Sequence, residues 1–405
     1  MTTVHERLDG TAVTVKNRVR EQVDAARDRL LALSHTIHAH PEPAFEETRA
    51  AWWVIEVLTA GGFVVEPGVG GLDTAFSAVC GSGDLTVGIC AEYDALPEIG
   101  HACGHNVIAA AAVGAALGLA AVADELGIRV KVIGTPAEEH GGGKILLLER
   151  GVFDDVTVAM MVHPAPFDVH PADSASQAVT RFAVTYTGRP AHAAAAPHLG
   201  VNAADAAVIA QVAIGLLRQQ VTGDCRIGLF VRKGGEVTNI IPDETVVDCE
   251  VRAFDGEELD TLYRRVVACF EAGAHASGAT LEIHETEPTY AALKQDSTLA
   301  EYYAENITGL GRDLGERGRL SGGSTDMGNV SQVLPSIHPM IGLRTENTPH
   351  TRGFAEDAAS PAADDAVVDG ALAMAFTGVD VALDTAARIR FVDAHRERSR
   401  RTLGR

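Results

Sequence analysis

The order of apolar runs changes once along this chain, and the change limits the fold more than any other feature of the sequence. Before about residue 176, short β-branched runs such as residues 87–90 and 130–134 alternate with helical patterns such as residues 107–122. Strands that alternate with helices are typical of a mostly parallel α/β sheet. Between residues 180 and 285 the order becomes strand, helix, strand, strand, helix, strand, which is the ferredoxin-like α+β plan.

The α/β pattern returns after Tyr290. We therefore predict a discontinuous main domain with an α/β, mostly parallel sheet, formed by residues 1–175 and 290–405. A smaller, ferredoxin-like α+β domain, residues 176–289, is inserted in it. A chain of 405 residues suits two domains better than one ordinary core.

Net charge and cysteine content limit the classes of binding partner and indicate the redox environment of the protein. The formal net charge is -22, which argues against nucleic acid or an acidic membrane as a partner. Six cysteines are scattered without a paired framework, and this favours a reduced, cytoplasmic setting. The apolar run at residues 107–122 is short for a membrane span and contains Gly114 and Gly118, so we predict a buried helix there.

The strongest local signal is the segment HACGHN, residues 101–106, which lies between a predicted strand and a predicted helix. Polar side chains there lie at the carboxyl edge of the sheet, where open α/β folds bind ligands. Cys103 and His105 are two positions apart, and both residue types bind zinc-like ions. Taken alone, the pair is explained equally well by a buried thiol beside a histidine that caps a helix.

A second polar segment, TPAEE at residues 135–139, follows the predicted strand that ends near Gly134. One of two adjacent carboxylates can bind a metal while the other moves protons, because a cation and an apolar wall shift carboxyl pKa values in opposite directions. In isolation, a solvated loop whose acids cap the next helix is the simpler interpretation.

Two further histidines complete the pattern. His163 follows a third apolar strand, and His350 lies in a late loop. Each alone is typical of a packed or hydrogen-bonded histidine. Ligand-type side chains nevertheless follow three successive strands and recur in one late loop, so separate explanations for all of them become improbable. We predict that they meet around a divalent cation beside a glutamate that binds no metal.

These motifs, in this order, resemble metallopeptidase family twenty, which includes aminoacylases, glutamate-releasing carboxypeptidases and auxin-conjugate amidohydrolases. The resemblance runs from about residue 35 to 375 and includes the segments GRPAHAAAAPHLGVNAADA and VTNIIPDE. The segments EYDALP at residues 92–97 and GSTDM at residues 323–327 are most similar to the aminobenzoyl-glutamate hydrolase and aminoacylase-like dipeptidase branch.

The resemblance implies a catalytic main domain that hydrolyses amide bonds with one or two divalent ions per subunit. Glu138 matches the general base that activates water, and Asp94 matches the acid that orients a group at the metal site. The residues that match metal ligands are Cys103, His105, Glu139, His163 and His350.

The resemblance also implies that the inserted domain is a dimerisation or lid domain, so a homodimer is expected. His192 matches the lid histidine that stabilises the oxyanion in a partner subunit's site. Asn239 and Arg252 match contacts to the substrate carboxylate and the oxyanion, and an arginine fork suits a carboxylate. A turn histidine and an ordinary sheet-surface charge remain the alternatives for His192 and Arg252. Gly323 and Ser324 are expected to shape a substrate pocket.

Two positions depart from the family pattern. Many members carry His-x-Asp where this chain has Glu92, Tyr93 and Asp94, and the auxin-conjugate branch often has Asp where this chain has Asn106. Zinc suits the cysteine and histidine ligands, whereas manganese suits the carboxylates. Both metals therefore remain candidates.

Three functions are compatible with the sequence. We favour a metal-dependent amidohydrolase that cleaves an N-acyl amino acid, an aminobenzoyl-glutamate-like conjugate or a dipeptide. A binding module that holds a peptide or metabolite without cleaving it is the second, and the departures at Glu92 and Asn106 motivate it. Removal of a carbamoyl group in the same site is the third.

Overall fold

The computed structural model describes residues 10–315 and 320–403. The chain divides into two compact units. Unit 1 comprises the chain up to Ala175, the segment Lys294–Ser321 and the chain from Asn329 onward. Unit 2 comprises Ser176–Leu293 and the separate segment Gly322–Gly328. The sequence placed the inserted domain at residues 176–289 and did not anticipate the second segment.

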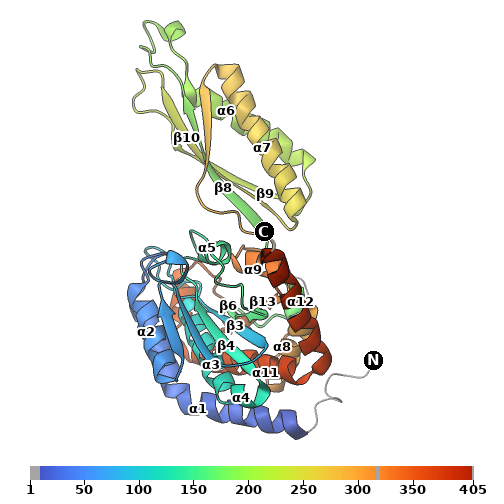
Figure 1. The fold of residues 1–405 in the computed structure, drawn as a ribbon. Coiled ribbons are helices and arrows are strands. Elements are labelled where there is room, and N and C mark those ends of the chain that lie inside the picture. Colours follow the sequence, from blue (N-terminus) through green and yellow to red (C-terminus); the bar gives the residue numbers. More distant parts are fainter. Residues whose placement is uncertain (1–9, 316–319, 404–405) are drawn as a thin grey trace. The chain divides into compact units, whose positions relative to one another are not determined.

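Unit 1 is built on a six-stranded sheet (Figure 1). In spatial order its strands are β1 (Val64–Pro67), β2 (Phe76–Gly81), β4 (Ile128–Gly134), β3 (Leu85–Ala91), β5 (Val158–Met160) and β13 (Ser336–Ile337). β4, β3, β5 and β13 are parallel, whereas β2 is antiparallel to both β1 and β4. The prediction of a mostly parallel sheet is confirmed, and the parallel strands direct their carboxyl ends to one edge.

Three long helices pack on one another in unit 1: α1 (Gly10–Ala39), α3 (His105–Ala120) and α11 (Pro361–Leu383). α3 is buried along nearly all its length, as predicted. Gly114 permits its close approach to α11, because an added Cβ would lie 2.7 Å from the Cβ of Ala371. α11 is long and apolar enough to cross a membrane, but 89% of its apolar window is buried inside the fold, as in a core helix.

The remaining elements of unit 1 surround this core. They are α2 (Thr48–Ala60), α4 (Ala123–Leu126), α5 (Gly143–Glu149), α8 (Ser297–Gly309), α10 (Arg352–Asp357), α12 (Thr385–Leu403), the strand pair β6 (His163–Ala165) and β14 (Met340–Gly342), and the pair β7 (Ser174–Ala175) and β12 (Leu320–Ser321). α9 (Met327–Val333) begins in unit 2 and continues in unit 1. The C-terminal stretch is rich in arginine. It forms α12. The Arg388 side chain of this helix donates hydrogen bonds to the carbonyls of Leu126 and Gly127.

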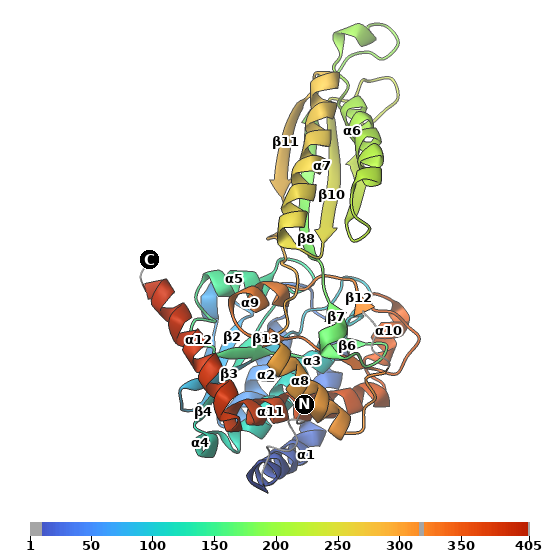
Figure 2. The same cartoon turned by 90° about the vertical axis from the view of Figure 1, so that its right-hand side faces the viewer.

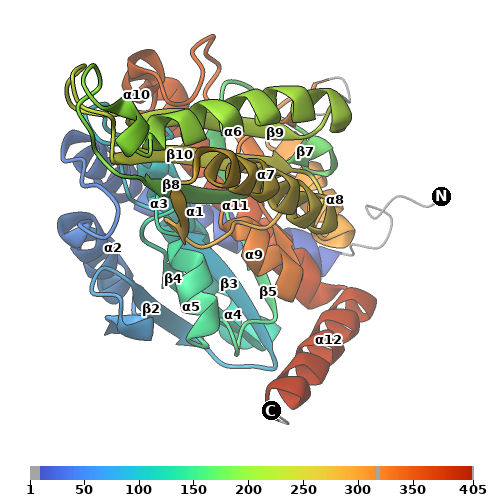
Figure 3. The same ribbon diagram turned by 90° about the horizontal axis from the view of Figure 1, so that it is seen from above.

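Unit 2 is a four-stranded antiparallel sheet with two helices on one face (Figures 2 and 3). The spatial order is β11 (Thr280–Glu285), β8 (Ala178–Thr187), β10 (Glu244–Ala253) and β9 (Arg226–Lys233). The helices are α6 (Ala203–Leu217) and α7 (Gly256–Ser277). Every second residue of β10 is buried, which is why one face of the sheet receives both helices. Chain order and spatial order together confirm the ferredoxin-like plan.

Candidate metal centre

Side chains that bind metals gather at one place in unit 1. Three overlapping groups each bring their ligand atoms within 4.8 Å of one another. The groups are Cys103, His105 and His163; Cys103, Glu139 and His350; and Glu92, His105 and Glu138. The structure therefore brings together all five of the proposed metal ligands with the proposed general base.

The ends of the parallel strands position these groups. Asp94 follows β3, and Glu138 and Glu139 follow β4. His163 begins β6 shortly after β5, and His105 begins α3. Because parallel strands end at the same edge of a sheet, residues far apart in the chain meet there.

Asp94 orients His105. The Nδ1 atom of His105 donates to Asp94 Oδ1 at 3.0 Å, so the Nε2 atom is directed at the other carboxylates. Nε2 lies 3.6 Å from Glu92 Oε2 and 3.9 Å from oxygens of both Glu138 and Glu139. A carboxylate behind a ligating histidine fixes its ring orientation and raises its basicity.

The pKa values of this pair follow from the same contact. Burial alone lowers the pKa of His105, but the charge of Asp94 and its hydrogen bond outweigh burial and raise the pKa well above its usual value. Burial alone raises the pKa of Asp94, but His105 brings it down to about 2. Asp94 is therefore a carboxylate that can only accept hydrogen bonds.

The turn that carries the two glutamates is strained. Ala137 has a left-handed backbone, with φ at +60°, although it is not a glycine. Such a residue costs on the order of 1–3 kcal/mol and persists only where its surroundings enforce it. Asp94 Oδ2 accepts a hydrogen bond from the Glu139 amide at 2.9 Å. Gly143 closes the turn, because an added Cβ would lie 1.9 Å from the Pro136 carbonyl oxygen.

The remaining ligand contacts support a cation. His350 Nε2 lies 3.2 Å from Cys103 Sγ and 3.5 Å from Glu139 Oε2. Burial, followed by the charge of Glu139, raises the pKa of the Cys103 thiol well above its usual value. Among the described residues, His105 Nε2 and Glu139 Oε1 are buried without a hydrogen-bond partner. Thiol, imidazole and carboxylate groups crowded in this way fit a divalent cation, which displaces their protons on binding.

Sequence reasoning missed two buried residues beside this cluster, Lys144 and His338. Lys144 and Glu92 are both fully buried, and Lys144 Nζ lies 2.5 Å from Glu92 Oε1. Glu92, which departs from the family pattern, is therefore neutralised by a lysine. His338 is also buried, with its ring 5.2 Å from that of His163, and burial lowers its pKa well below the usual value. The apolar run after Lys144 is the only sequence signal that pointed to a buried lysine.

His192 and Asn239 lie together in unit 2. A single antiparallel bridge pairs His192 with Ile240, and the backbone carbonyl of Asn239 accepts a hydrogen bond from the Ala193 amide at 2.9 Å. His192 Nδ1 accepts from the amides of Ala194 and Ala195 at 3.2 and 3.1 Å. Because Nδ1 accepts, the neutral ring carries its proton on Nε2. His192 thus presents an exposed donor, as a residue that stabilises an oxyanion must.

Arg252 lies in unit 2 with its fork engaged. Its Nε and Nη2 atoms donate to the two carboxylate oxygens of Glu250 at 3.0 Å, and Nη1 donates to Ser324 Oγ at 3.0 Å. The Gly323 carbonyl accepts from the Gln177 amide at 2.9 Å. Arg252, Gly323 and Ser324 are therefore close together, but the arginine fork holds a carboxylate of the protein itself. Their contacts with substrate stay predictions.

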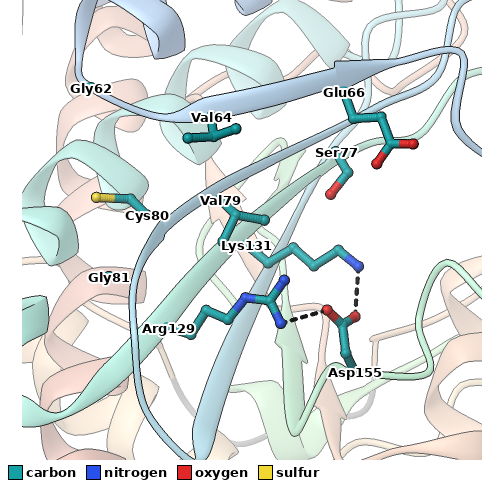
Figure 4. A pocket seen from close by; sticks show the side chains of 10 residues that line it. All are labelled: Gly62, Val64, Glu66, Ser77, Val79, Cys80, Gly81, Arg129, Lys131 and Asp155. Carbon is teal, nitrogen blue, oxygen red and sulfur yellow. Dashed lines mark hydrogen bonds and ion pairs between the residues drawn. The ribbon is translucent and has the colours of Figure 1, made fainter.

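Unit 1 also has a hollow, whose lining contains none of the residues of the metal-binding cluster (Figure 4). Its charged groups include Arg129, Lys131 and Asp155. Both cations bind the one carboxylate, at 2.8 and 2.6 Å. These three charges therefore pair with one another.

Comparison with known proteins identifies the family. A model of the peptidase dimerisation domain of M20 enzymes matches residues 175–277. The Xaa-Arg dipeptidase of Mus musculus is 40% identical over 386 residues, which cover 91% of this chain and 89% of the mouse protein. The chain belongs to the M20 metallopeptidase family. The predicted resemblance is thereby confirmed, and this M20 protein is a hydrolase of amide bonds.

Two other M20 relatives extend the comparison. One component of the p-aminobenzoyl-glutamate hydrolase of Escherichia coli is 30% identical over 284 residues, which cover 65% of this chain and 59% of that protein. A dinuclear metal-binding M20 peptidase of Bacillus subtilis has a TM-score of 0.68 at 22% identity, with 88% of this chain and 99% of that chain covered. The second match shows a shared fold.

Proposed function

We propose that this M20 protein is a dipeptidase that uses one or two divalent cations, zinc or manganese. The observation that carries the proposal is a pair of overlapping ligand groups that share Cys103, one with His105 and His163 and one with Glu139 and His350, together with a third group that places Glu138 beside His105. The mouse Xaa-Arg dipeptidase matches more of the chain, at higher identity, than the aminobenzoyl-glutamate hydrolase does. We therefore favour dipeptides with a cationic C-terminal residue over N-acyl amino acids and aminobenzoyl-glutamate-like conjugates.

Glu138 is the group that moves protons in this scheme. A divalent cation in the cluster supplies Lewis acidity, which polarises a carbonyl and makes water easier to deprotonate. Glu138 Oε2 lies 3.9 Å from His105 Nε2. Its carboxylate takes a proton from the attacking water and returns it to the leaving amine. Asp94 keeps His105 and the Glu139 amide in place during both transfers.

Two surfaces of unit 2 support a homodimer. Exposed apolar side chains on α6 recur every four residues, at Val208, Val212 and Leu216. β9 is an edge strand of its sheet and exposes Phe230 and Val231. An exposed apolar stripe beside an unpaired strand edge suits a second copy of the same surface. In such a dimer we propose that the Nε2 proton of His192 stabilises an oxyanion in the partner's site.

We also propose that the protein works in the cytoplasm. The six cysteines are all free, which supports a reduced, cytoplasmic environment.

The decisive experiment uses Glu138→Gln. Because a positioned general base contributes about 10²–10⁴-fold, turnover of Xaa-Arg dipeptides should fall by about that factor. Metal analysis after dialysis should show the same zinc or manganese content as the unaltered protein. Full activity of the variant would remove Glu138 from the mechanism. An unaltered protein that binds metal and dipeptide but cleaves nothing would favour the binding module, and the masses of the products would reveal removal of a carbamoyl group.

A second experiment tests the role of His192 across the dimer. We mix the inactive variants His192→Ala and Glu138→Gln, so that hybrid dimers form. If His192 acts in the partner's site, a fraction of the hybrids has one complete site and activity returns. Persistent inactivity of a mixture that has demonstrably exchanged protomers would contradict action in the partner.

A further inference from the structure

Glu47 is a fully buried carboxylate that neither the motifs nor the proposed mechanism uses. It lies immediately before α2, and its side chain reaches into the interior of unit 1. Its Oε1 atom accepts a hydrogen bond from the Ala137 amide at 2.9 Å. Its Oε2 atom accepts one from Thr74 Oγ1 at 2.9 Å. A carboxylate is expensive to bury, so two donors aimed at it indicate a specific role.

The residue that Glu47 holds is the strained one. Ala137 has φ at +60° and directly precedes Glu138 and Glu139. An L-residue adopts this conformation only when neighbouring groups enforce it. The bond from its amide to Glu47 fixes the direction of the peptide plane from which the two glutamates follow.

Two carboxylates thus hold alternate amides of one turn. Glu47 holds Ala137, and Asp94 holds Glu139. Glu138 lies between the two fixed points. Thr74 links the surroundings of the two carboxylates. Its hydroxyl donates to Glu47, and its carbonyl accepts from Tyr93 Oη at 2.5 Å. Tyr93 is the chain neighbour of Asp94.

We propose that Glu47 is a positioning residue that holds the turn at residues 137–139, so that Glu139 can bind the cation and Glu138 can reach the attacking water. The inference rests on the proposed metal-dependent hydrolysis. It predicts that the geometry of the acceptor matters more than its charge, because the bond from the Ala137 amide needs only an oxygen at the position of Oε1.

The test compares Glu47→Leu with Glu47→Gln. Leucine removes the acceptor, whereas glutamine keeps an oxygen for the Ala137 amide. Zn²⁺ affinity is measured on the metal-free protein by competition with a chromophoric chelator. The values of kcat and KM are measured on the zinc-loaded protein, and Tm reports folding. Glu42→Gln is the matched control, since Glu42 is also buried in this segment but binds the amides of Arg49 and Ala50 at the start of α2.

Glu47→Leu should weaken Zn²⁺ binding by about tenfold or more, as is usual for groups behind metal ligands. Its kcat should fall by about 100-fold with little change in KM, because displaced reacting groups cost that much. Glu47→Gln should stay near the unaltered protein in both values, and Glu42→Gln should match it as well. Unaltered Zn²⁺ affinity and kcat in a folded Glu47→Leu protein would overturn the inference. Equal losses in Glu42→Gln and Glu47→Leu would overturn it too.

If Glu47→Leu does not fold, the Zn²⁺ affinity of Thr74→Val tests the inference instead. This substitution removes the donor that steadies Glu47, and it should weaken Zn²⁺ binding several-fold, whereas unaltered affinity would contradict the inference. Zn²⁺ affinity also separates this inference from the proposed function. An unaltered protein that cleaves no dipeptide refutes the function, while the affinities of the variants still test Glu47.

Discussion

Unit 1 buries most of the polar side chains of its metal centre, whereas unit 2 exposes its candidate catalytic residues. Glu92, Asp94, His105 and Lys144 are all buried and contact one another. His192 and Asn239, in contrast, lie in exposed loops of unit 2. Buried charges must be paired, so packing fixes the geometry of unit 1 before any ligand arrives. Exposed groups add little to stability and become effective only when another surface covers them. Variants in the two units should therefore lose different properties.

The largest effect on stability should come from Lys144→Met. Removing one partner of a buried ion pair takes the nearest cation away from Glu92 and costs about 3–5 kcal/mol of unfolding free energy. Urea denaturation of the metal-free protein measures this. Lys131→Met is the control, since its partner Asp155 is 38% exposed and water can compensate for the lost ion pair. Equal losses of unfolding free energy in the two variants would show that the burial of the ion pair does not determine its contribution to stability.

His192→Ala should have the converse effect. Loss of one donor to an oxyanion lowers kcat by about 10²–10³-fold. The unfolding free energy should change by less than about 0.5 kcal/mol, because the side chain is exposed. Steady-state kinetics and urea denaturation measure the two values. His198→Ala, which alters an exposed histidine of the same loop, should retain unaltered kcat. A large loss of stability in His192→Ala would contradict the contrast between the units.

The pH dependence of stability should reveal the buried charge at Glu47. Burial, followed by the charge of Asp94, raises the Glu47 pKa from 4.5 to about 7. Between these values the folded state keeps a proton that the unfolded state has released. Unfolding free energy therefore falls as pH rises through this window, by about 3 kcal/mol in total.

Glu47→Gln lacks this titration. Relative to the unaltered protein, the metal-free variant should gain stability steadily from pH 5 to pH 8 in urea denaturation. Glu42→Gln provides the comparison. A difference between Glu47→Gln and the unaltered protein that stays constant with pH would contradict the raised pKa.

The smallest effect should come from the apolar surface of unit 2. Leu216→Ser removes an exposed leucine from the α6 stripe and should weaken a homodimer by about 2 kcal/mol, or about thirtyfold in Kd. Sedimentation velocity at several concentrations measures this. Leu199→Ser alters an exposed leucine outside the stripe and should leave the dimer intact. If the unaltered protein is a monomer, the exposed apolar residues of α6 do not form a dimer interface.

Local patterns were sufficient to predict most of the fold. The apolar run at residues 87–90 and the polar residues after it lie next to each other in sequence, so the end of β3 could be predicted directly. The same holds for the end of β4 before Glu138. The metal-binding residue types of HACGHN also stand together. Clustering of these residues followed from one further step, because parallel strands end at a common edge.

The contacts that hold the metal-binding cluster in place could not be predicted in this way. Glu47 and its partner Ala137 are 90 residues apart, and no periodicity links them. Glu92 and Lys144 are also brought together only by the packing of β3 against the start of α5. The antiparallel direction of β2 is likewise a property of its neighbours in the sheet. The extent of α12 could not be predicted because its arginines gain partners, such as the carbonyls of Leu126 and Gly127, that only the folded chain supplies.

The chain enters unit 2 twice, because Gly322–Gly328 belongs to it as well as Ser176–Leu293. A chimera that transplants only the longer stretch into a related enzyme would leave Arg252 facing a foreign residue in place of Ser324. The amide of Gln177 would then depend on the backbone of the foreign segment for the acceptor that Gly323 supplies here. Domain exchange between such enzymes therefore calls for transplanting both segments together.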